Sequence, residues 1–231
     1  MHGTWADEPI FALRQALRSW DHYQQQIADC DCQIAAVLPP LDPTQPSLAK
    51  TAKRAGVNAP EIAKLREILA QMGGGRDLTR LLAHMHYGVL QLIGEVGTDL
   101  SAWPSEKHFT AWAGLAPGNH DSGKRRGRVK RGRHRTGRLF CMMAQSLVRS
   151  KDIELGGFYR RLAARRGGLV ATQALARKLA AWFWHVMVKG DDYVEQGRAH
   201  YEQSVRKTKA RALKRLAREL GQQIMPLPQS P

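Results

Sequence analysis

Apolar residues recur at alternating steps of three and four near the start of the chain, the spacing of a coiled-coil seam. They are Ile10, Leu13, Leu17, Trp20, Ile27, Ile34 and Leu38. The pattern predicts one long helix from about Glu8 to Leu38. Polar Gln24 and Asp31 fall on the same seam, where such residues usually set register or partner number. The helix could pair with a copy of itself, with a neighbouring helix, or with the body of the domain.

A dense run of prolines follows this helix and predicts a linker over residues 39–60. A short helix is expected from about Pro60 to Met72, ended by the three glycines at 73–75. Asp77 is placed to cap the helix that comes next.

That next helix has a continuous apolar face made by Leu78, Leu81, Leu82, Met85, Val89, Leu92 and Ile93. Gly88 and Gly94 could split it into a helix-turn-helix pair. His84 and His86 lie two residues apart, and a helix would point them about 200° apart. This favours packing or surface histidines over a metal site.

Three further helical patterns follow. Residues 139–148 are apolar on most sides and are expected at the centre of the core. Residues 170–188 place an apolar face on one side, made by Leu175, Leu179, Trp182, Phe183 and Val186. Residues 192–220 form a basic pattern that could track a phosphate backbone or could be a solvated helix. The fold class is therefore mainly α, with segments 1–38, 39–60, 61–190 and 191–231.

Charge is unevenly placed along the chain, whose net charge is +16. Residues 1–120 carry 10 Lys and Arg against 12 Asp and Glu, a net of −2, so residues 121–231 carry +18. Such a concentrated positive half favours a polyanionic partner, with nucleic acid preferred over an anionic membrane surface. The 3 cysteines are too few and scattered for a disulfide framework. With no apolar run of membrane-spanning length and no signal-peptide pattern, we expect a cytoplasmic protein without a membrane partner.

The most basic segment runs from Lys124 to Arg138 and holds nine Lys or Arg in fifteen residues. A helix would place these cations in mutual repulsion, so the run predicts a loop or hairpin along phosphates. Arginine, which dominates the run, matches phosphate oxygens two at a time. The candidate nucleic-acid-binding residues are Lys124, Arg125, Arg126, Arg128, Lys130, Arg131, Arg133, Arg135 and Arg138.

Ser122 stands just before this run. A serine that attacks a phosphodiester needs clustered cations to stabilise charge on the phosphoryl oxygens. It also needs a proton acceptor, and His120 and Asp121 adjoin it in the sequence. In a glycine-containing loop the alternative role is that of a turn residue.

These residues make the sequence recognisable. The chain resembles the transposases of insertion-sequence family 110, with relatives 116 and 902, which are similar to the Piv DNA invertases. The match runs through Ser105-Glu106-Lys107-His108-Phe109, Trp112, Gly114-Leu115-Ala116-Pro117-Gly118-Asn119 and Ser122-Gly123-Lys124. It continues in residues 144–151, 155–168, 176–180 and 193–197, and the 8–34 stretch looks like the helical region that precedes the family's C-terminal domain.

The resemblance implies a compact helical transposase domain with Ser122 as the catalytic nucleophile on DNA. It also implies a guide RNA as a further nucleic-acid ligand. Full-length members begin with a RuvC-like domain whose four acidic residues bind divalent metal. We expect no cofactor in this chain, with Mg²⁺ confined to that domain, and expect the chain to be the C-terminal part of such a transposase. The main hypothesis is therefore the serine-nucleophile half of a DNA recombinase that self-associates through its N-terminal helix. The alternative is a non-catalytic nucleic-acid-binding remnant.

Overall fold

All regular structure in the described part of the chain is helical. The computed structural model describes residues 7–44, 48, 59–83, 85–117, 134–150 and 155–222. The nine helices in these ranges are α1 (Asp7–Val37), α2 (Leu65–Met72), α3 (Leu78–Leu81), α4 (His86–Val96), α5 (Glu106–Trp112), α6 (Arg135–Ser146), α7 (Leu155–Arg166), α8 (Gly168–Lys189) and α9 (Asp191–Glu219). The predicted fold class, mainly α, is confirmed, and the four-part division of the chain stays a prediction.

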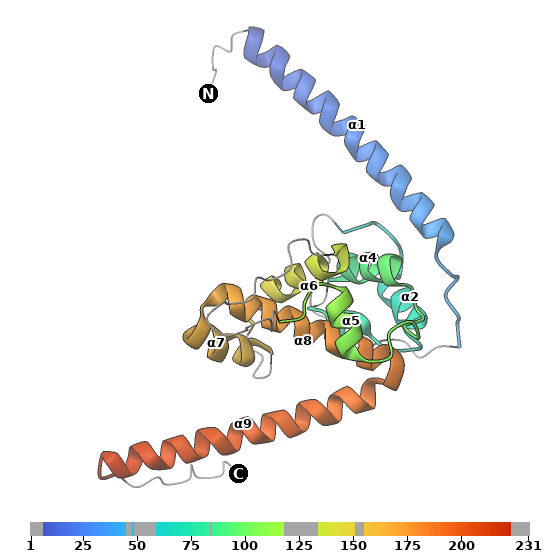
Figure 1. Ribbon diagram of the computed structural model, residues 1–231. Helices are drawn as coiled ribbons and strands as arrows, with labels where there is room; N and C mark the ends of the chain where they lie inside the picture. The colour runs from blue at the N-terminus through green and yellow to red at the C-terminus, as the bar shows by residue number, and fades with distance from the viewer. Residues whose placement is uncertain are drawn as a thin grey trace, which may run out of the picture.

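Helix α8 is the centre of the folded body (Figure 1), and it packs against α5, α6 and α7. Its buried face carries Leu175, Leu179 and Phe183, as the sequence pattern predicts. The Phe183 ring lies 6.0 Å from the rings of both Phe109 and Phe140, which belong to α5 and α6. Aromatic rings at this spacing add to the hydrophobic stabilisation of the core.

The two tryptophans near the end of α8 differ from the prediction. Trp182 was expected on the buried face, but it is half-buried, with the Lys178 ammonium 4.8 Å from its ring centre. Trp184 is buried instead, and its indole N–H donates to the carbonyl of Trp103 at 3.0 Å. A buried indole usually needs such an acceptor, which explains why Trp184 takes the inner position.

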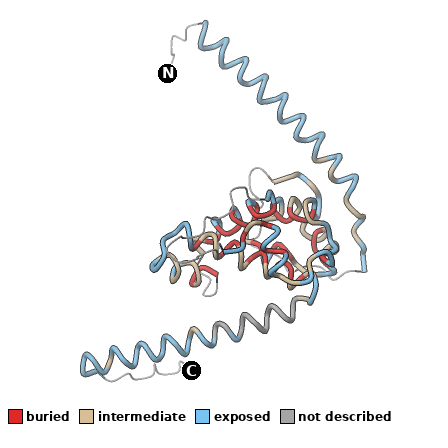
Figure 2. Tube along the Cα trace, viewed as in Figure 1, coloured by how far each residue is buried: buried red, intermediate tan, exposed pale blue. Residues whose placement is uncertain are grey.

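Helix α1 leads away from the body and none of its residues is buried (Figure 2). Leu13, Trp20 and Ile27 on its apolar seam are 61%, 60% and 52% exposed. The predicted helix is confirmed, whereas the suggestion that it packs on the body of its own chain is wrong. At its far end Asp31 accepts a hydrogen bond from the backbone N–H of Glu61.

Helix α2 begins later than expected. Residues 60–62 have no regular structure, residues 63 and 64 form a turn, and the helix starts at Leu65 because Lys64 has a left-handed backbone conformation, with φ 52°. Its end agrees with the prediction, since Gly73 caps it and the positive φ of Gly74 and Gly75 turns the chain.

The helix predicted beyond Asp77 is broken, but at neither of the expected glycines. It divides into α3 and α4, with Ala83 between them at φ 61°. Gly88 lies inside α4, where a Cβ would come within 3.0 Å of the Met143 side chain, and Gly94 also lies inside α4. Gly88 therefore serves close packing of α4 on α6 rather than a turn.

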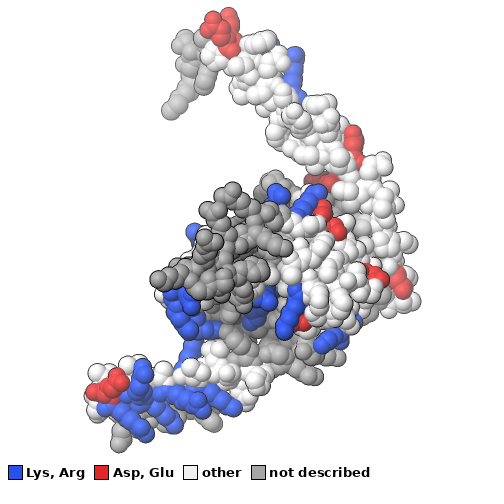
Figure 3. Space-filling model, viewed as in Figure 1, with Lys and Arg blue, Asp and Glu red and all other residues white. Residues whose placement is uncertain are grey.

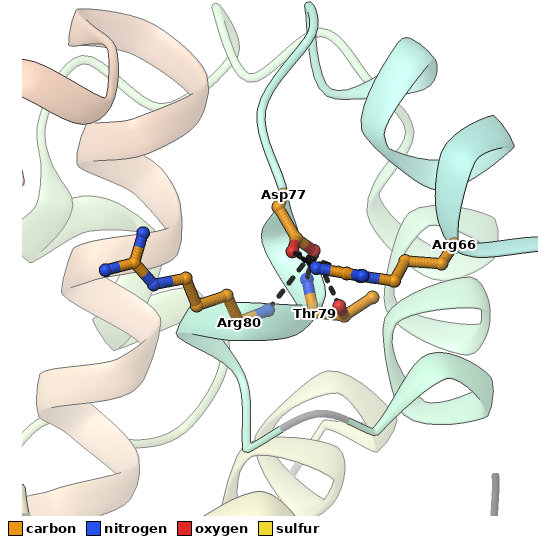
Figure 4. Close-up of polar contacts among 4 residues, drawn as sticks. All are labelled: Arg66, Asp77, Thr79 and Arg80. Atoms are coloured by element: carbon orange, nitrogen blue, oxygen red, sulfur yellow. Dashed lines mark hydrogen bonds and ion pairs between the residues drawn. The ribbon is translucent and has the colours of Figure 1, made fainter. Parts of the chain in front are cut away.

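Asp77 joins α2 to α3, as Figure 4 shows. Its side chain accepts from the backbone N–H groups of Thr79 and Arg80 at 3.1 and 3.3 Å, which confirms the predicted N-cap. It also forms an ion pair with Arg66, and the two side chains are 13% and 14% exposed. Burial raises the pKa of Asp77, but hydrogen bonds from Arg66 and Thr79 outweigh burial and hold the pKa below its usual value.

Asp77→Ala is expected to lower the free energy of unfolding by about 2–4 kcal/mol at pH 7. The change removes a helix cap and leaves a largely buried guanidinium without its carboxylate. Because the folded-state pKa of Asp77 is lowered, its ionised form stabilises the fold above the unfolded-state pKa of about 3.9. That contribution is lost as the pH falls through the lower folded-state value. Urea titrations should therefore show a smaller difference in the free energy of unfolding between the wild type and Asp77→Ala at pH 3 than at pH 7.

The matched control for this prediction is Asp99→Ala. Asp99 makes the same kind of contact with the backbone N–H and hydroxyl of Ser101, but both residues are exposed. Asp99→Ala should lower the free energy of unfolding by much less than Asp77→Ala does. An Asp77→Ala effect equal to that of the control, or one that grows at low pH, would contradict the role given to the Arg66 pair.

Candidate nucleic-acid interface

The predicted site residues fall into two groups. Arg135 and Arg138 lie at the start of α6 with exposed side chains. The other eight lie outside the described residues, and they are Ser122, Lys124, Arg125, Arg126, Arg128, Lys130, Arg131 and Arg133. The prediction of a loop or hairpin through Arg138 is wrong at its C-terminal end, because a helix begins at Arg135.

Local capping and burial explain this helical start. The His134 imidazole accepts from the backbone N–H of Thr136, as an N-cap side chain does. Thr136 and Gly137 are buried, so the first turn of α6 is part of the packed body. Packing outweighs the charge repulsion that favours an open loop, and Arg135 gains a partner in Glu95, with 3.0 Å between Nη1 and Oε1.

The segment 118–133 connects two points of the body that lie side by side. On one side is the end of α5, and on the other the start of α6. The rings of Trp112 and His134 have centres 4.1 Å apart. Gly137 approaches Ala113 so closely that an added Cβ would lie 2.0 Å from the Ala113 carbonyl oxygen. The residues that flank 118–133 in the sequence therefore meet at one place on the body, where the end of α5 contacts the start of α6.

The motif that precedes this segment supplies the support for that junction. Phe109 and Thr110 are buried in α5, and the Phe109 ring lies 5.2 Å from Trp103. Ser105 is at the N-cap position of α5, and its hydroxyl lies 2.8 Å from the His108 ring nitrogen. The Trp103 ring also contacts that of Trp112 at a tilted angle, with 4.8 Å between ring centres. Among the motif residues that the structure describes, Phe109 and Leu115 are buried and pack at this place in the body.

Helix α6, which begins at the junction, and the helices α7 and α8 carry a strong charge imbalance. No Asp or Glu occurs in the sequences of α6, α7 and α8, whereas each of these helices carries Arg or Lys. Figure 3 shows Lys and Arg side chains gathered on this side of the body and along α9. A surface of one sign draws an oppositely charged partner and raises its association rate.

Four arginines of α7 are part of this imbalance and were absent from the predicted site. They are Arg160, Arg161, Arg165 and Arg166. Burial lowers the pKa of Arg161, and the neighbouring guanidinium groups of Arg165 and Arg160 lower it further. Arg160 donates to the carbonyl of Ser150 at 2.7 Å. Residues 155–189 contain no Asp or Glu, and a count of acidic residues along the sequence, beside the count of cations, would have drawn attention to these arginines.

The described residues include no group of three or more His, Cys, Asp or Glu side chains that could hold a metal ion. His84 lies outside the described residues. His86 begins α4 half-buried, in agreement with the packing role expected for it, and burial together with Arg66 lowers its pKa. Within the same ranges, no helix is both long and apolar enough to cross a membrane.

Comparison with known proteins gives one family. Residues 87–160, from the start of α4 to the middle of α7, match the family model described as Transposase IS116/IS110/IS902 family. The match includes the segment 118–133 and both of its anchoring helices, and it confirms the family resemblance over these residues. No curated protein and no solved structure shows significant similarity to the chain.

Proposed function

Residues 87–160 are a domain of the IS116/IS110/IS902 transposase family, and from this premise we propose that the protein is the serine-nucleophile part of a DNA recombinase. It binds DNA through the basic segment, with a guide RNA as a further nucleic-acid ligand. The observation that carries the proposal is the position of that segment within the family domain. Trp112 before it and His134 after it are in ring contact at the junction of α5 and α6.

In the proposed reaction Ser122 is the nucleophile. Its hydroxyl oxygen attacks the phosphorus of a DNA phosphodiester, so that an O–P bond to serine forms and a P–O bond to a sugar breaks. The serine proton leaves, and the departing sugar oxygen gains one. The phosphoserine ester keeps the energy of the broken bond, so a sugar hydroxyl of a second strand can attack it and release Ser122.

The basic residues have two roles in this proposal. They neutralise phosphates and release counterions, which supplies most of the binding free energy. They also stabilise negative charge on the phosphoryl oxygens while the bonds exchange. Arg138, on the exposed side of α6, directly follows the buried pair Thr136 and Gly137. Arg135 is 65% exposed despite its pair with Glu95 and so can still reach a phosphate.

The experiment uses the full chain with labelled duplex DNA that carries a transposon terminal junction, in the presence of Mg²⁺. A RuvC-like domain of a related transposase, added as a separate polypeptide, supplies the acidic residues that the family resemblance implies. Denaturing electrophoresis then detects a covalent protein–DNA species. Formation of that species supports the proposal. Tight DNA binding with no covalent species, both with and without the added RuvC-like domain, favours the second candidate, a non-catalytic nucleic-acid-binding protein.

We further propose that the protein self-associates through α1. The apolar seam residues of α1 are exposed from Ile10 to Ile27, and among the described residues Trp20 and Ile27 keep 60% and 52% of their surface exposed. Pairing two copies buries these side chains, at about 25 cal/mol per Å² of apolar surface. Light scattering at micromolar concentration should therefore give at least a dimer.

Leu17→Lys with Trp20→Lys should convert that oligomer to a monomer, because charges on the seam oppose pairing. The matched control is Arg14→Lys with Arg18→Lys, which keeps the charge of the same helix. A monomeric wild-type protein at this concentration would refute the role of α1.

A further inference from the structure

Helix α9 has a basic face that the proposed function does not use. Its second half carries Arg206, Lys207, Lys209, Arg211, Lys214, Arg215 and Arg218, all exposed. Lys207, Arg211, Lys214 and Arg218 follow steps of four, three and four, so they form one stripe along the helix. Within the described ranges, none of these four lies in an ion pair, whereas Arg215 pairs with Glu219 at 3.6 Å.

The direction in which α9 leaves the body is fixed by a specific corner. Arg76 donates to the carbonyl oxygens of Val186 and Met187, at 2.6 and 3.4 Å, and so caps the end of α8. Gly190 follows with φ 98°, and an added Cβ there would lie 3.5 Å from the Arg76 guanidinium. In Figure 1, α9 turns at this corner and runs back below the body, so that its basic half points toward the α7 side.

The length and the positive charge of the stripe suit binding to a phosphate backbone. Its four cations extend over twelve residues, about 16 Å at 1.5 Å per residue. Duplex DNA carries one negative charge per roughly 1.7 Å of its axis, so several phosphates lie along such a length. The arginines of α7 present charge of the same sign, so a polyanion could contact both helices.

The opposite face of α9 favours DNA over a membrane as the partner. It exposes Leu213, Leu216 and Leu220, but no aromatic side chain accompanies them in the 203–222 stretch. Interfacial helices usually insert aromatic and leucine side chains together over a broad apolar face. Three leucines within eight residues provide a narrow face instead.

From these observations we propose that the stripe formed by Lys207, Arg211, Lys214 and Arg218 is a second duplex-DNA contact, separate from the segment 118–133. It binds the phosphate backbone of the DNA beside the phosphodiester that reacts. The inference rests on the proposed function for its substrate class, DNA. It does not depend on the chemistry assigned to Ser122.

The test measures how the DNA-binding constant of the full chain depends on salt, by fluorescence anisotropy with duplex DNA. In the stripe variant all four residues are alanine, a good helix former, so α9 should persist by circular dichroism. Each phosphate contact contributes about −0.9 to the slope of log K against log salt concentration. The stripe variant should therefore flatten the slope by about 3 to 4 units. A variant with four glutamines should give the same result.

Two comparisons distinguish this inference from the proposed function. The loop variant replaces Arg125, Arg126, Arg128 and Arg131 by alanine and should flatten the slope independently of the stripe variant. If the loop variant changes the slope and the stripe variant does not, the inference is overturned while the proposed function stands. If the stripe variant changes the slope but no covalent species forms with the wild type, the inference stands and the proposed chemistry fails.

The membrane alternative is tested with vesicles of phosphatidylserine and phosphatidylcholine. The wild type should bind them more weakly than duplex DNA at equal ionic strength. Loss of vesicle binding in the stripe variant, together with an unchanged slope on DNA, would overturn the inference in favour of a membrane contact.

Discussion

Ser122→Ala is expected to abolish the covalent protein–DNA species, by about a thousandfold or more in rate, while DNA affinity changes by less than about twofold. The hydroxyl oxygen is the atom that forms the bond to phosphorus in the proposed reaction, and alanine offers no substitute. Removal of a nucleophile typically costs most of an enzyme's rate enhancement, whereas binding contacts elsewhere persist. Denaturing electrophoresis measures the first effect, and anisotropy with the same DNA measures the second.

The matched control for this prediction is Ser204→Ala. Ser204 is exposed within α9, where alanine is the better helix former, and it precedes the basic stripe. This control should form the covalent species at the wild-type rate. Persistence of the species in Ser122→Ala would assign the bond to another residue and refute the role of Ser122. Loss of affinity in the same variant would instead indicate a role in DNA binding.

Hydrophobic periodicity predicted those helices whose apolar face can be recognised from the spacing of residues within the one helix. Helix α1 and, apart from Trp182, the inner face of α8 are of this kind, and both appear where they were expected. The capping role of Asp77 was equally local, since the carboxylate reaches N–H groups two and three residues away. Such features need no information about the rest of the chain.

The features that the sequence did not predict depend on contacts between distant residues. The apolar pattern continues through Ala83, so nothing local marks the break between α3 and α4. Gly88 was interpreted as a possible break because glycine is a poor helix former, but its small size serves contact with Met143. The helical start at Arg135 likewise depends on burial of Thr136 and Gly137 against α5.

The sequence predicted the basic segment of the candidate site better than it predicted which other helices add basic residues to the site. Its cation-rich segment is evident from the sequence alone, and the family match includes it. The arginines of α7 and the stripe on α9 were harder to assign, because a basic helix in sequence does not show whether carboxylates of other elements neutralise it. The structure adds that α6 and α7 each pack against α8 and that none of these three helices contains an acidic residue.

The anchoring of the basic segment gives the second large effect. Gly137→Ala is expected to lower the free energy of unfolding by about 3 kcal/mol or more, because the new Cβ would lie 2.0 Å from the Ala113 carbonyl oxygen. Backbone cannot move aside as a flexible side chain can, so α6 must shift away from the end of α5. That shift would also separate His134 from Trp112, whose ring centres are 4.1 Å apart. Urea denaturation measures the loss of stability, and anisotropy should show weaker DNA binding at temperatures where the variant remains folded.

Gly94→Ala is the matched control, since Gly94 also lies inside a helix but has no atom within 4 Å of an added Cβ. Alanine in an open helical position should raise the free energy of unfolding by about 0.5–1 kcal/mol. The two substitutions thus add the same methyl group with opposite expected signs, so a general effect of replacing glycine cannot produce both results. If Gly137→Ala is as stable as Gly94→Ala, α5 and α6 are not in tight contact there. The basic segment would then lack the single anchoring point on which its proposed presentation to DNA depends.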